Sequence, residues 1–457
     1  MANLIRNAFI ICQKLITYNL SLKTNSYFHL MLRKLILFCL PLIVSKAFAG
    51  FADIEFIKSK TIKSVKLFPT GNQLNYPIVK LGMAEQLELH FDDISDYTKS
   101  YYYTYQLCNA DWTPVDLSQF DYIKGFSQGR ITEYRPSSVA LTRYVHYTIN
   151  LPERNSMPTR SGNYLIKVFE NGDTSNLLFT KKMLVVETKA GIAAKMVAPF
   201  ENNSFYTKQR LALTVSTSAL DVYNVNQQLK VVVLQNNRWD NAQMALAPTF
   251  IRDKIMEYNS EGTFEFEGGK EFLWLDLRSF RLQSDRVRRG TYGDNSTALM
   301  VHADTSRASF HYQYYKDDDG SYIVEMLEDY NYWWQSDYAN VRFTYYPPGH
   351  QPYQDKDLYL LGEMTQFRTD DNSKMEFNEA KGAYEKTLFL KNGYYDYTYV
   401  TKDNTPDAVP SFDLTEGNSW ETENQYTVLV YYMGFGGRAD ELVSTATINS
   451  IGTLQSR

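Results

Sequence analysis

The feature that most constrains this chain is a series of short runs in which apolar and polar residues alternate with a period of two. The clearest runs are residues 86–91, 101–107, 144–151, 164–170, 181–187, 210–216 and 228–234. Such alternation is typical of half-buried β-strands, because successive side chains of a strand point to opposite faces of the sheet. No window of eleven or more residues shows the spacing of an amphipathic helix. We therefore expect an all-β protein.

The length of the chain indicates several domains of this kind. Its 457 residues include 36 Tyr, 26 Phe and 6 Trp, and aromatic rings pack well on a pleated surface. Turn signals such as Asn171-Gly172-Asp173 and Glu261-Gly262 separate the alternating runs. One immunoglobulin-like sandwich takes about 100 residues. The sequence thus predicts tandem immunoglobulin-like β-sandwich domains.

Two breaks in the pattern suggest where these domains meet. The alternating run 182–187 ends at Thr188-Lys189-Ala190-Gly191, which predicts a boundary near residue 189. Residues 345–352 contain three prolines and a glycine, which cannot continue a strand, so we expect a second boundary near 351. The predicted domains are 50–189, 190–351 with extra strands that include a hairpin over 311–326, and 352–457.

The N-terminal segment has the order of a secretory signal peptide. Met31 to Lys34 carry positive charge, residues 35–44 are apolar, and Ala47 and Ala49 are the small residues expected before a cleavage site. We predict cleavage between Ala49 and Gly50, and we interpret residues 1–30 as an extended charged region or a misassigned upstream start. The apolar stretch is shorter than the roughly 20 residues that span a bilayer, so no direct membrane span is expected.

The charge of the remaining chain argues against a nucleic-acid-binding protein, and its cysteine content argues against an internal disulfide. Without residues 1–49 the chain has 41 basic and 52 acidic residues, a net charge of −11, which argues against binding nucleic acid. Cys108 is the one cysteine left after cleavage, so it has no partner for an internal disulfide. We interpret Cys108 as a small buried apolar residue.

One motif suggests serine chemistry, but its context does not. Residues 125–129 match the Gly-x-Ser-x-Gly elbow around Ser127, which needs a strand before it and a helix after it. The chain reaches Pro136 soon afterwards and leaves no room for a useful helix. We therefore expect a loop here.

The candidate metal and acid–base residues also favour structural roles. The histidines of the exported chain are His90, His146, His302, His311 and His350, with no pair at metal-ligand spacing. Asp317-Asp318-Asp319-Gly320 lacks the alternate acidic positions and closing Glu of a calcium loop and predicts an Asp-Gly hairpin turn. Carboxylates such as Glu325 and Glu328 could pair by chance. We expect no catalytic residue, no cofactor and no metal site.

Trp333 and Trp334 are the candidate interaction aromatics. They lie in an aromatic-rich stretch from Tyr330 to Tyr338. Such a cluster is typical of core packing, of a carbohydrate-stacking platform or of a protein-binding hot spot.

Several segments of the first predicted domain resemble the plug protein of the type IX secretion system, a family of exported proteins in Bacteroidota. They are Tyr103–Pro114, Tyr122–Phe126, Tyr144–Tyr147, Leu151-Pro152 and Ser161–Leu165, followed near the C-terminus by Glu421–Tyr432 and Arg438–Val443. The resemblance implies a periplasmic subunit at the inner face of the outer membrane. That subunit would close the periplasmic mouth of the large β-barrel translocon when no substrate is in transit. The family brings no catalytic residues with it.

A second resemblance concerns the last predicted domain. Residues 358–364 and 388–399 are similar to the glycogen-binding branch of the immunoglobulin-like E-set domains. The aromatic that this branch usually carries after its Gly-Glu element is represented only by Phe367. This similarity therefore implies a fold more than a sugar ligand.

Three hypotheses follow from these observations. The first is a gating subunit of the type IX translocon that works by protein–protein contact and is not an enzyme. The alternative is a periplasmic or surface glycan-binding protein that uses Trp333, Trp334 or the C-terminal domain. The third is an exported hydrolase, which would require Ser127 or a pair of carboxylates.

Overall fold

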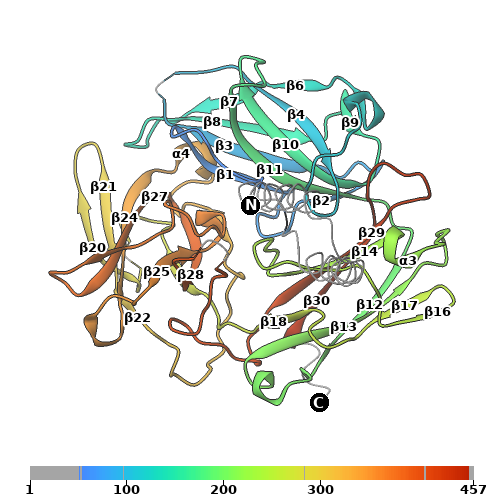
Figure 1. Ribbon diagram of the computed structural model, residues 1–457. Helices are drawn as coiled ribbons and strands as arrows, with labels where there is room; N and C mark the ends of the chain where they lie inside the picture. The colour runs from blue at the N-terminus through green and yellow to red at the C-terminus, as the bar shows by residue number, and fades with distance from the viewer. Residues whose placement is uncertain (1–50, 52–53, 96, 283, 406–407, 452–457) are drawn as a thin grey trace, which may run out of the picture. The chain divides into compact units, whose positions relative to one another are not determined.

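The computed structural model describes residues 51, 54–95, 97–282, 284–405 and 408–451. The predicted signal peptide and its cleavage site at Ala49 and Gly50 lie outside these residues. The described chain folds almost entirely into β-strands, so the prediction of an all-β fold is confirmed. The strands form three sandwich-like groups (Figure 1). Within the described ranges, no helix is long and apolar enough to cross a membrane.

The first sandwich contains eleven strands. They are β1 (Ile62–Pro69), β2 (Ile78–Lys80), β3 (Leu87–Asp93), β4 (Tyr101–Cys108), β5 (Ile123–Gly125), β6 (Gln128–Ile131), β7 (Glu133–Pro136), β8 (Val145–Leu151), β9 (Ser156–Pro158), β10 (Gly162–Glu170) and β11 (Leu177–Val186). The two main sheets have the orders β1-β3-β8-β7 and β2-β11-β10-β4-β6, and β5 pairs with β9. Strand β4 illustrates the period of two. Tyr101, Tyr103, Tyr105 and Leu107 all enter the core between the sheets, whereas Cys108 packs on the opposite side.

The second sandwich combines the middle of the chain with its C-terminal strands. Its strands are β12 (Gly191–Val197), β13 (Lys208–Ser216), β14 (Leu229–Gln235), β15 (Gln243–Ala245), β16 (Phe250–Arg252), β17 (Ile255–Tyr258), β18 (Glu265–Glu267), β29 (Gln425–Tyr432) and β30 (Glu441–Asn449). One sheet has the order β12-β13-β17-β16 with β18 on β13, and the other has the order β15-β14-β29-β30. Figure 1 shows β29 beside β14, although these strands lie far apart in the sequence.

The third sandwich is inserted between β18 and β29. Its strands are β19 (Leu273–Asp276), β20 (Val287–Tyr292), β21 (Thr297–Val301), β22 (Asp304–Thr305), β23 (Tyr322–Val324), β24 (Tyr338–Tyr346), β25 (Lys356–Leu361), β26 (Glu376–Asn378), β27 (Ala383–Lys391) and β28 (Gly393–Asp403). One sheet has the order β19-β28-β23 with β25 on β28, and the other has the order β20-β21-β24-β27-β26 with β22 on β24. Their inner faces share one apolar core.

The strand pairing does not follow the boundary expected near residue 351. Strand β24 before it pairs with β27 after it, from Tyr338 opposite Lys391 to Tyr345 opposite Tyr384. The proline-rich segment is a surface loop with a short helix η3 (Pro348–His350), and it ends one strand without ending the domain. Residues 190–351 and 352–457 are thus shared between two sandwiches. The expected cut near 189, by contrast, falls between β11 and β12, which belong to different sheets.

The hairpin expected over residues 311–326 is absent from the described structure. Tyr322–Val324 form β23, which pairs with β28 and not with residues 311–316. The Asp-Gly turn itself is present, because Asp319 and Gly320 have φ angles of 55° and 79° and the amide of Ser321 donates to the carbonyl of Asp318 over 3.0 Å. Turn chemistry was therefore predicted correctly, but the strand that follows finds a distant partner.

Candidate functional site

Trp333 and Trp334 lie where the first and third sandwiches meet. Both belong to the short helix α4 (Tyr332–Gln335), which precedes β24. The Trp333 ring stacks on the ring of His90 with 3.8 Å between centroids. Trp334 lies 5.5 Å from the guanidinium of Arg135. The two residues proposed as interaction aromatics therefore contact the first sandwich, and His90 covers one face of Trp333.

Beneath Trp333 lies a buried set of polar side chains, which we call the junction network. Its members are Glu88, His90, Asp92 and His146 from the first sandwich and Tyr338 and Lys391 from the third. The Asp92 carboxylate accepts hydrogen bonds from His146 Nδ1 over 2.7 Å and from Lys391 Nζ over 2.5 Å. Tyr338 Oη also donates to Asp92 over 2.5 Å. Asp92 therefore joins two sandwiches that are far apart in sequence.

The two histidines extend the junction network toward solvent. His146 Nε2 lies 3.0 Å from His90 Nδ1, and His90 Nε2 lies 3.1 Å from the carboxylate of Glu88. Two neutral imidazoles carry two ring N–H hydrogens between them, but three contacts join Asp92 to His146, His146 to His90, and His90 to Glu88. While both rings are neutral, one of the three contacts therefore lacks a hydrogen, and one further proton would complete all three.

The charges of the junction network are balanced at its buried centre. Burial lowers the pKa of His146 to about 4, although Asp92 acts in the opposite direction, so His146 is neutral at pH 7. Burial also lowers the pKa of Lys391 and would raise that of Asp92. The attraction of Lys391 and the hydrogen bond from His146 outweigh burial for Asp92 and hold its pKa below the ordinary value. One carboxylate thus faces one ammonium.

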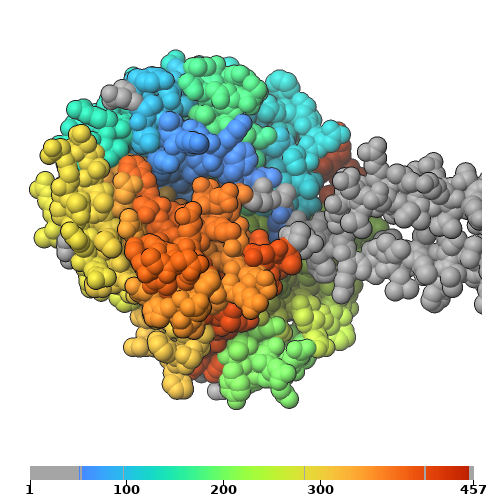
Figure 2. All heavy atoms as spheres, turned by 60° about the vertical axis from the view of Figure 1, so that its left-hand side comes forward, coloured from blue at the N-terminus to red at the C-terminus, as the bar shows by residue number. Residues whose placement is uncertain are grey.

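A second ion pair joins the same two sandwiches. Lys66 Nζ on β1 contacts the Glu363 carboxylate in helix η4 (Glu363–Thr365) at 2.7 Å and the carbonyl of Tyr322 at 2.7 Å. Gln73 adds hydrogen bonds to the carbonyl and the amide of Val324 over 2.9 and 2.8 Å. In Figure 2 the blue segment of the first sandwich lies directly against the orange segment of the third. The contact between them is therefore polar and specific.

A second cluster, which is partly buried, has a different composition. Five carboxylates, which we call the acidic cluster, approach one another between the second and third sandwiches: Glu271, Asp317, Asp319, Asp396 and Glu423. Asp317, Asp319 and Glu423 each offer an oxygen that lies within 4.8 Å of the others. The sequence pattern predicted only the turn at residues 317–320, because Glu271, Asp396 and Glu423 come from other parts of the chain.

Backbone amides hold the acidic cluster in place. Asp317 accepts a hydrogen bond from the amide of Phe272 over 2.5 Å, and Asp396 accepts one from the amide of Asp318. Glu271 accepts from the hydroxyl of Tyr312 and from the amide of Glu423. In the part of the chain that the structure describes, Glu271 Oε2, Asp319 Oδ1 and Asp396 Oδ1 are buried without a hydrogen-bond partner.

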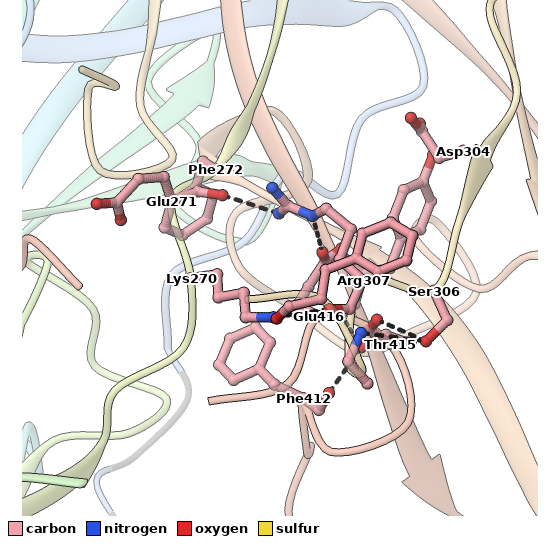
Figure 3. Close-up of polar contacts among 12 residues, drawn as sticks. Lys270, Glu271, Phe272, Asp304, Ser306, Arg307, Phe412, Thr415 and Glu416 are labelled. Carbon is pink, nitrogen blue, oxygen red and sulfur yellow. Dashed lines mark hydrogen bonds and ion pairs between the residues drawn. The ribbon is translucent and has the colours of Figure 1, made fainter. Parts of the chain in front are cut away.

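Two basic residues beside the acidic cluster have other partners. Arg307 forms an ion pair with Glu416, and its Nη2 donates to the backbone carbonyl of Glu271 over 2.8 Å. Lys270 Nζ donates to the carbonyls of Arg307 and Phe310 over 2.6 and 2.8 Å. Figure 3 shows the Glu271 carboxylate pointing away from the pair of Arg307 and Glu416. None of the ion pairs among the described residues includes a member of the acidic cluster.

The pKa values of the acidic cluster reflect this missing countercharge. Burial, reinforced by the neighbouring carboxylates, raises the pKa of Glu271 to about 8, that of Asp317 to about 7 and that of Asp396 to about 8. The same causes raise the pKa of Asp319 well above its ordinary value. The acidic cluster therefore favours a proton or a cation.

The remaining candidate residues have structural surroundings. Gly125 ends β5 and Gln128 begins β6, so Phe126 and Ser127 connect two strands, and the expectation that no helix follows Ser127 is confirmed. The Ser127 carbonyl accepts a hydrogen bond from Thr104 over 2.6 Å. Cys108 is fully buried, as expected, and burial raises the pKa of its thiol to about 12. The described residues place neither Ser127 nor Cys108 in the junction network or the acidic cluster.

Comparison with known proteins gives two informative similarities. Residues 62–187 match the family model described as the type 9 secretion system plug protein 1st domain. The chain is also similar to a hypothetical protein from Parabacteroides merdae, with a TM-score of 0.82 and 28% sequence identity over 88% of this chain and 99% of the other. A partial N-terminal region of an enterococcal surface protein aligns at a TM-score of 0.18 and 6% identity, over 89% of this chain and 97% of the other, and carries no argument. No curated protein matches the chain.

Proposed function

We propose that this protein is a periplasmic plug subunit of a type IX secretion translocon. It would seal the periplasmic opening of the large outer-membrane β-barrel by protein–protein binding, without a cofactor and without catalysis. The observation that carries this proposal is the match of residues 62–187 to the first domain of the plug family, which extends from β1 to the end of β11.

The contacts between sandwiches suit this role. A subunit that closes a wide, water-filled barrel must withstand force as one body. The first sandwich is tied to the third by the pairs Lys66–Glu363 and Asp92–Lys391. It is tied to the second by Asp440, which accepts a hydrogen bond from the amide of Ala110 over 3.0 Å. These buried polar contacts require a defined geometry, so they favour one orientation of the sandwiches.

Exposed aromatic residues suggest which surface meets the barrel. Phe120 is 82% exposed and lies in helix η1 (Gln119–Asp121) of the matched domain, and Phe435 is 93% exposed between β29 and β30. The loop of Phe435 reaches the matched domain, because Arg438 donates to the carbonyl of Asp116. Exposed rings of this size are typical of protein-binding surfaces. We expect both phenylalanines to contact the periplasmic side of the barrel.

Affinity purification tests the proposal. The tagged protein is purified from detergent-solubilised envelopes after mild cross-linking, and its partners are identified by mass spectrometry. We expect a very large outer-membrane barrel as the dominant partner, with less of it recovered by the double variant Phe120→Asp/Phe435→Asp. The control is Tyr223→Asp, since Tyr223 is 82% exposed in the second sandwich. Failure to enrich any barrel with the unmodified protein would contradict the proposal.

Closure of the barrel needs its own measurement. A deletion strain should admit small hydrophilic dyes or antibiotics through the outer membrane, and the intact gene should restore the barrier. A glycan array measures the alternative of sugar binding. Binding of a defined glycan that is lost in Trp334→Ala, together with no barrel partner, would favour that alternative.

A further inference from the structure

The acidic cluster occupies the two connections between the second and third sandwiches. Residues 268–272 lead from β18 to β19 and contain Glu271, and residues 419–424 return to β29 and contain Glu423. The connections lie side by side, because the amide of Ser419 and the hydroxyl of Thr422 both donate to the carbonyl of Gly269, over 2.9 and 2.8 Å. Asp317, Asp319 and Asp396 belong to the third sandwich.

The spacing of the oxygens fits a calcium ion. Calcium binds six to eight oxygens at about 2.3–2.6 Å, so ligands on opposite sides of the ion lie about 5 Å apart. The oxygens of Asp317, Asp319 and Glu423 lie within 4.8 Å of one another. Magnesium requires shorter contacts of about 2.0–2.1 Å in a strict octahedron. Magnesium is also usually held by only one or two carboxylates, so a set of several protein carboxylates is better suited to calcium.

Two further carboxylates supply an independent sign of a ligand. Glu271 and Asp396 are each only 1% exposed, yet each keeps one carboxylate oxygen without a hydrogen-bond partner within the described chain. Buried carboxylates in folded proteins are normally paired or bound to a metal. Glu271 accepts a hydrogen bond from the amide of Glu423 over 3.3 Å, and Asp396 accepts one from the amide of Asp318, so both side chains lie beside this group of oxygens.

We propose that Glu271, Asp317, Asp319, Asp396 and Glu423 bind one calcium ion. The ion supplies the positive charge that Arg307 and Lys270 do not, since those side chains are engaged with Glu416 and with backbone carbonyls. It joins both connections to the third sandwich and so fixes that sandwich relative to the second. The site belongs to the fold of the free protein and does not depend on a barrel partner.

Calcium titration of the full exported chain tests the site. The protein is first treated with a chelator, and binding is then followed by calorimetry, by the melting temperature, and by terbium luminescence sensitised by Tyr312. We expect saturable binding of one ion and a higher melting temperature with calcium, and a weaker effect of magnesium. Calcium at 100 times its dissociation constant should lower the unfolding equilibrium constant by about 100-fold. Stabilisation by acid alone, with no saturable binding of calcium or terbium, would overturn the proposal.

Isosteric variants locate the ion. Asp319→Asn and Asp396→Asn should each weaken calcium binding at least about 10-fold, because each removes a charged ligand. The matched control is Asp253→Asn, because Asp253 is exposed and shares the left-handed backbone of Asp319, with φ angles of 52° and 55°. Unchanged affinity in both cluster variants would contradict the assignment. A loss in the control alone would contradict it as well. These measurements use the isolated protein, so they can fail while the barrel is still recovered by affinity purification.

Discussion

The junction network and the acidic cluster both have buried members, and both connect the third sandwich to a neighbour, but their charges differ. In the junction network the Asp92 carboxylate has the Lys391 ammonium at 2.5 Å and donors from His146 and Tyr338. In the acidic cluster five carboxylates meet without an ion-paired cation among the described residues. The charge at the centre of the first is compensated within the chain. The second requires a proton or an ion from the solution.

This difference predicts opposite responses to the same chemical change. Removing one charge of a balanced buried pair leaves the other charge without compensation and is strongly destabilising. Removing one charge from a group of like charges relieves repulsion. Neutralising substitutions therefore distinguish the two clusters.

The largest effect is expected at the centre of the junction network. Asp92→Asn leaves the Lys391 ammonium buried without a carboxylate, and Lys391→Met leaves Asp92 without its ammonium. Each change should lower the free energy of unfolding by about 3–5 kcal/mol. Urea denaturation of the protein measures it.

The double variant Asp92→Asn/Lys391→Met controls for the loss of either side chain alone. Because it contains no uncompensated charge, it should be more stable than the sum of the single variants predicts. If the stability losses of the two single variants simply add in the double variant, Asp92 and Lys391 are not coupled. The junction network would then not be a balanced charge pair.

The two adjacent tryptophans at the edge of the junction network should differ in how much they contribute to stability. Trp333 covers His90, and its carbonyl accepts from Lys391 Nζ over 2.5 Å, whereas Trp334 contacts the guanidinium of Arg135. We expect Trp333→Ala to cost about 3 kcal/mol. Trp334→Ala should cost less than about 1 kcal/mol. Thermal denaturation of both variants checks the order, and equal losses would contradict it.

The pH dependence of the junction network has a defined sign. His146 faces Asp92, His90, Lys391 and the ring of Trp333, and burial lowers its pKa from 6.5 to about 4. Between these values the unfolded state binds the proton and the folded state does not. Stability is therefore fully present above about pH 6.5 and is lost as the pH falls toward 4, by on the order of 2 kcal/mol.

A variant isolates this contribution from the other titrating groups. In His146→Gln the side chain no longer titrates, so the stability difference between wild type and variant should shrink from pH 7 to pH 4.5. Urea denaturation at several pH values gives this difference. A constant difference would mean that the pKa of His146 is the same in the folded and unfolded protein, which would contradict the effect of burial.

The local pattern of the sequence predicted much of the fold because a strand is encoded locally. The alternating run 101–107 became β4, with Tyr101 and Tyr103 in the core. The pattern could not predict which strands pair, because that choice depends on contacts between distant residues. The prolines near 351 correctly predicted the end of a strand, which is β24. No local pattern, however, indicates that the chain returns to the same sheet as β27.

The same limit applies to the two clusters. His90 and His146 lie on paired strands, yet neither has a neighbour in sequence that identifies the other. Asp317 and Asp319 were visible as a turn, whereas Glu271 and Glu423 are brought together by insertion of one sandwich into another. Because the site combines residues from both ends of the inserted sandwich, its members have no fixed spacing in the sequence that would identify it. The match to the first domain of the plug family covers residues 62–187, which contain none of these five carboxylates.

The smallest expected effect completes the comparison. In calcium-free buffer, Asp396→Asn should change the free energy of unfolding by no more than about 1 kcal/mol and should tend to stabilise the protein. The retained oxygen still accepts from the amide of Asp318, and the new amide group replaces the oxygen that had no partner with a donor facing carboxylates. The same substitution at Asp92 should cost several times more, since Asp92 neutralises Lys391. Addition of calcium should raise the stability of the wild type but not of Asp396→Asn. If Asp396→Asn instead destabilises the calcium-free protein as much as Asp92→Asn does, then the acidic cluster holds a countercharge within the chain, and the distinction between the two clusters fails.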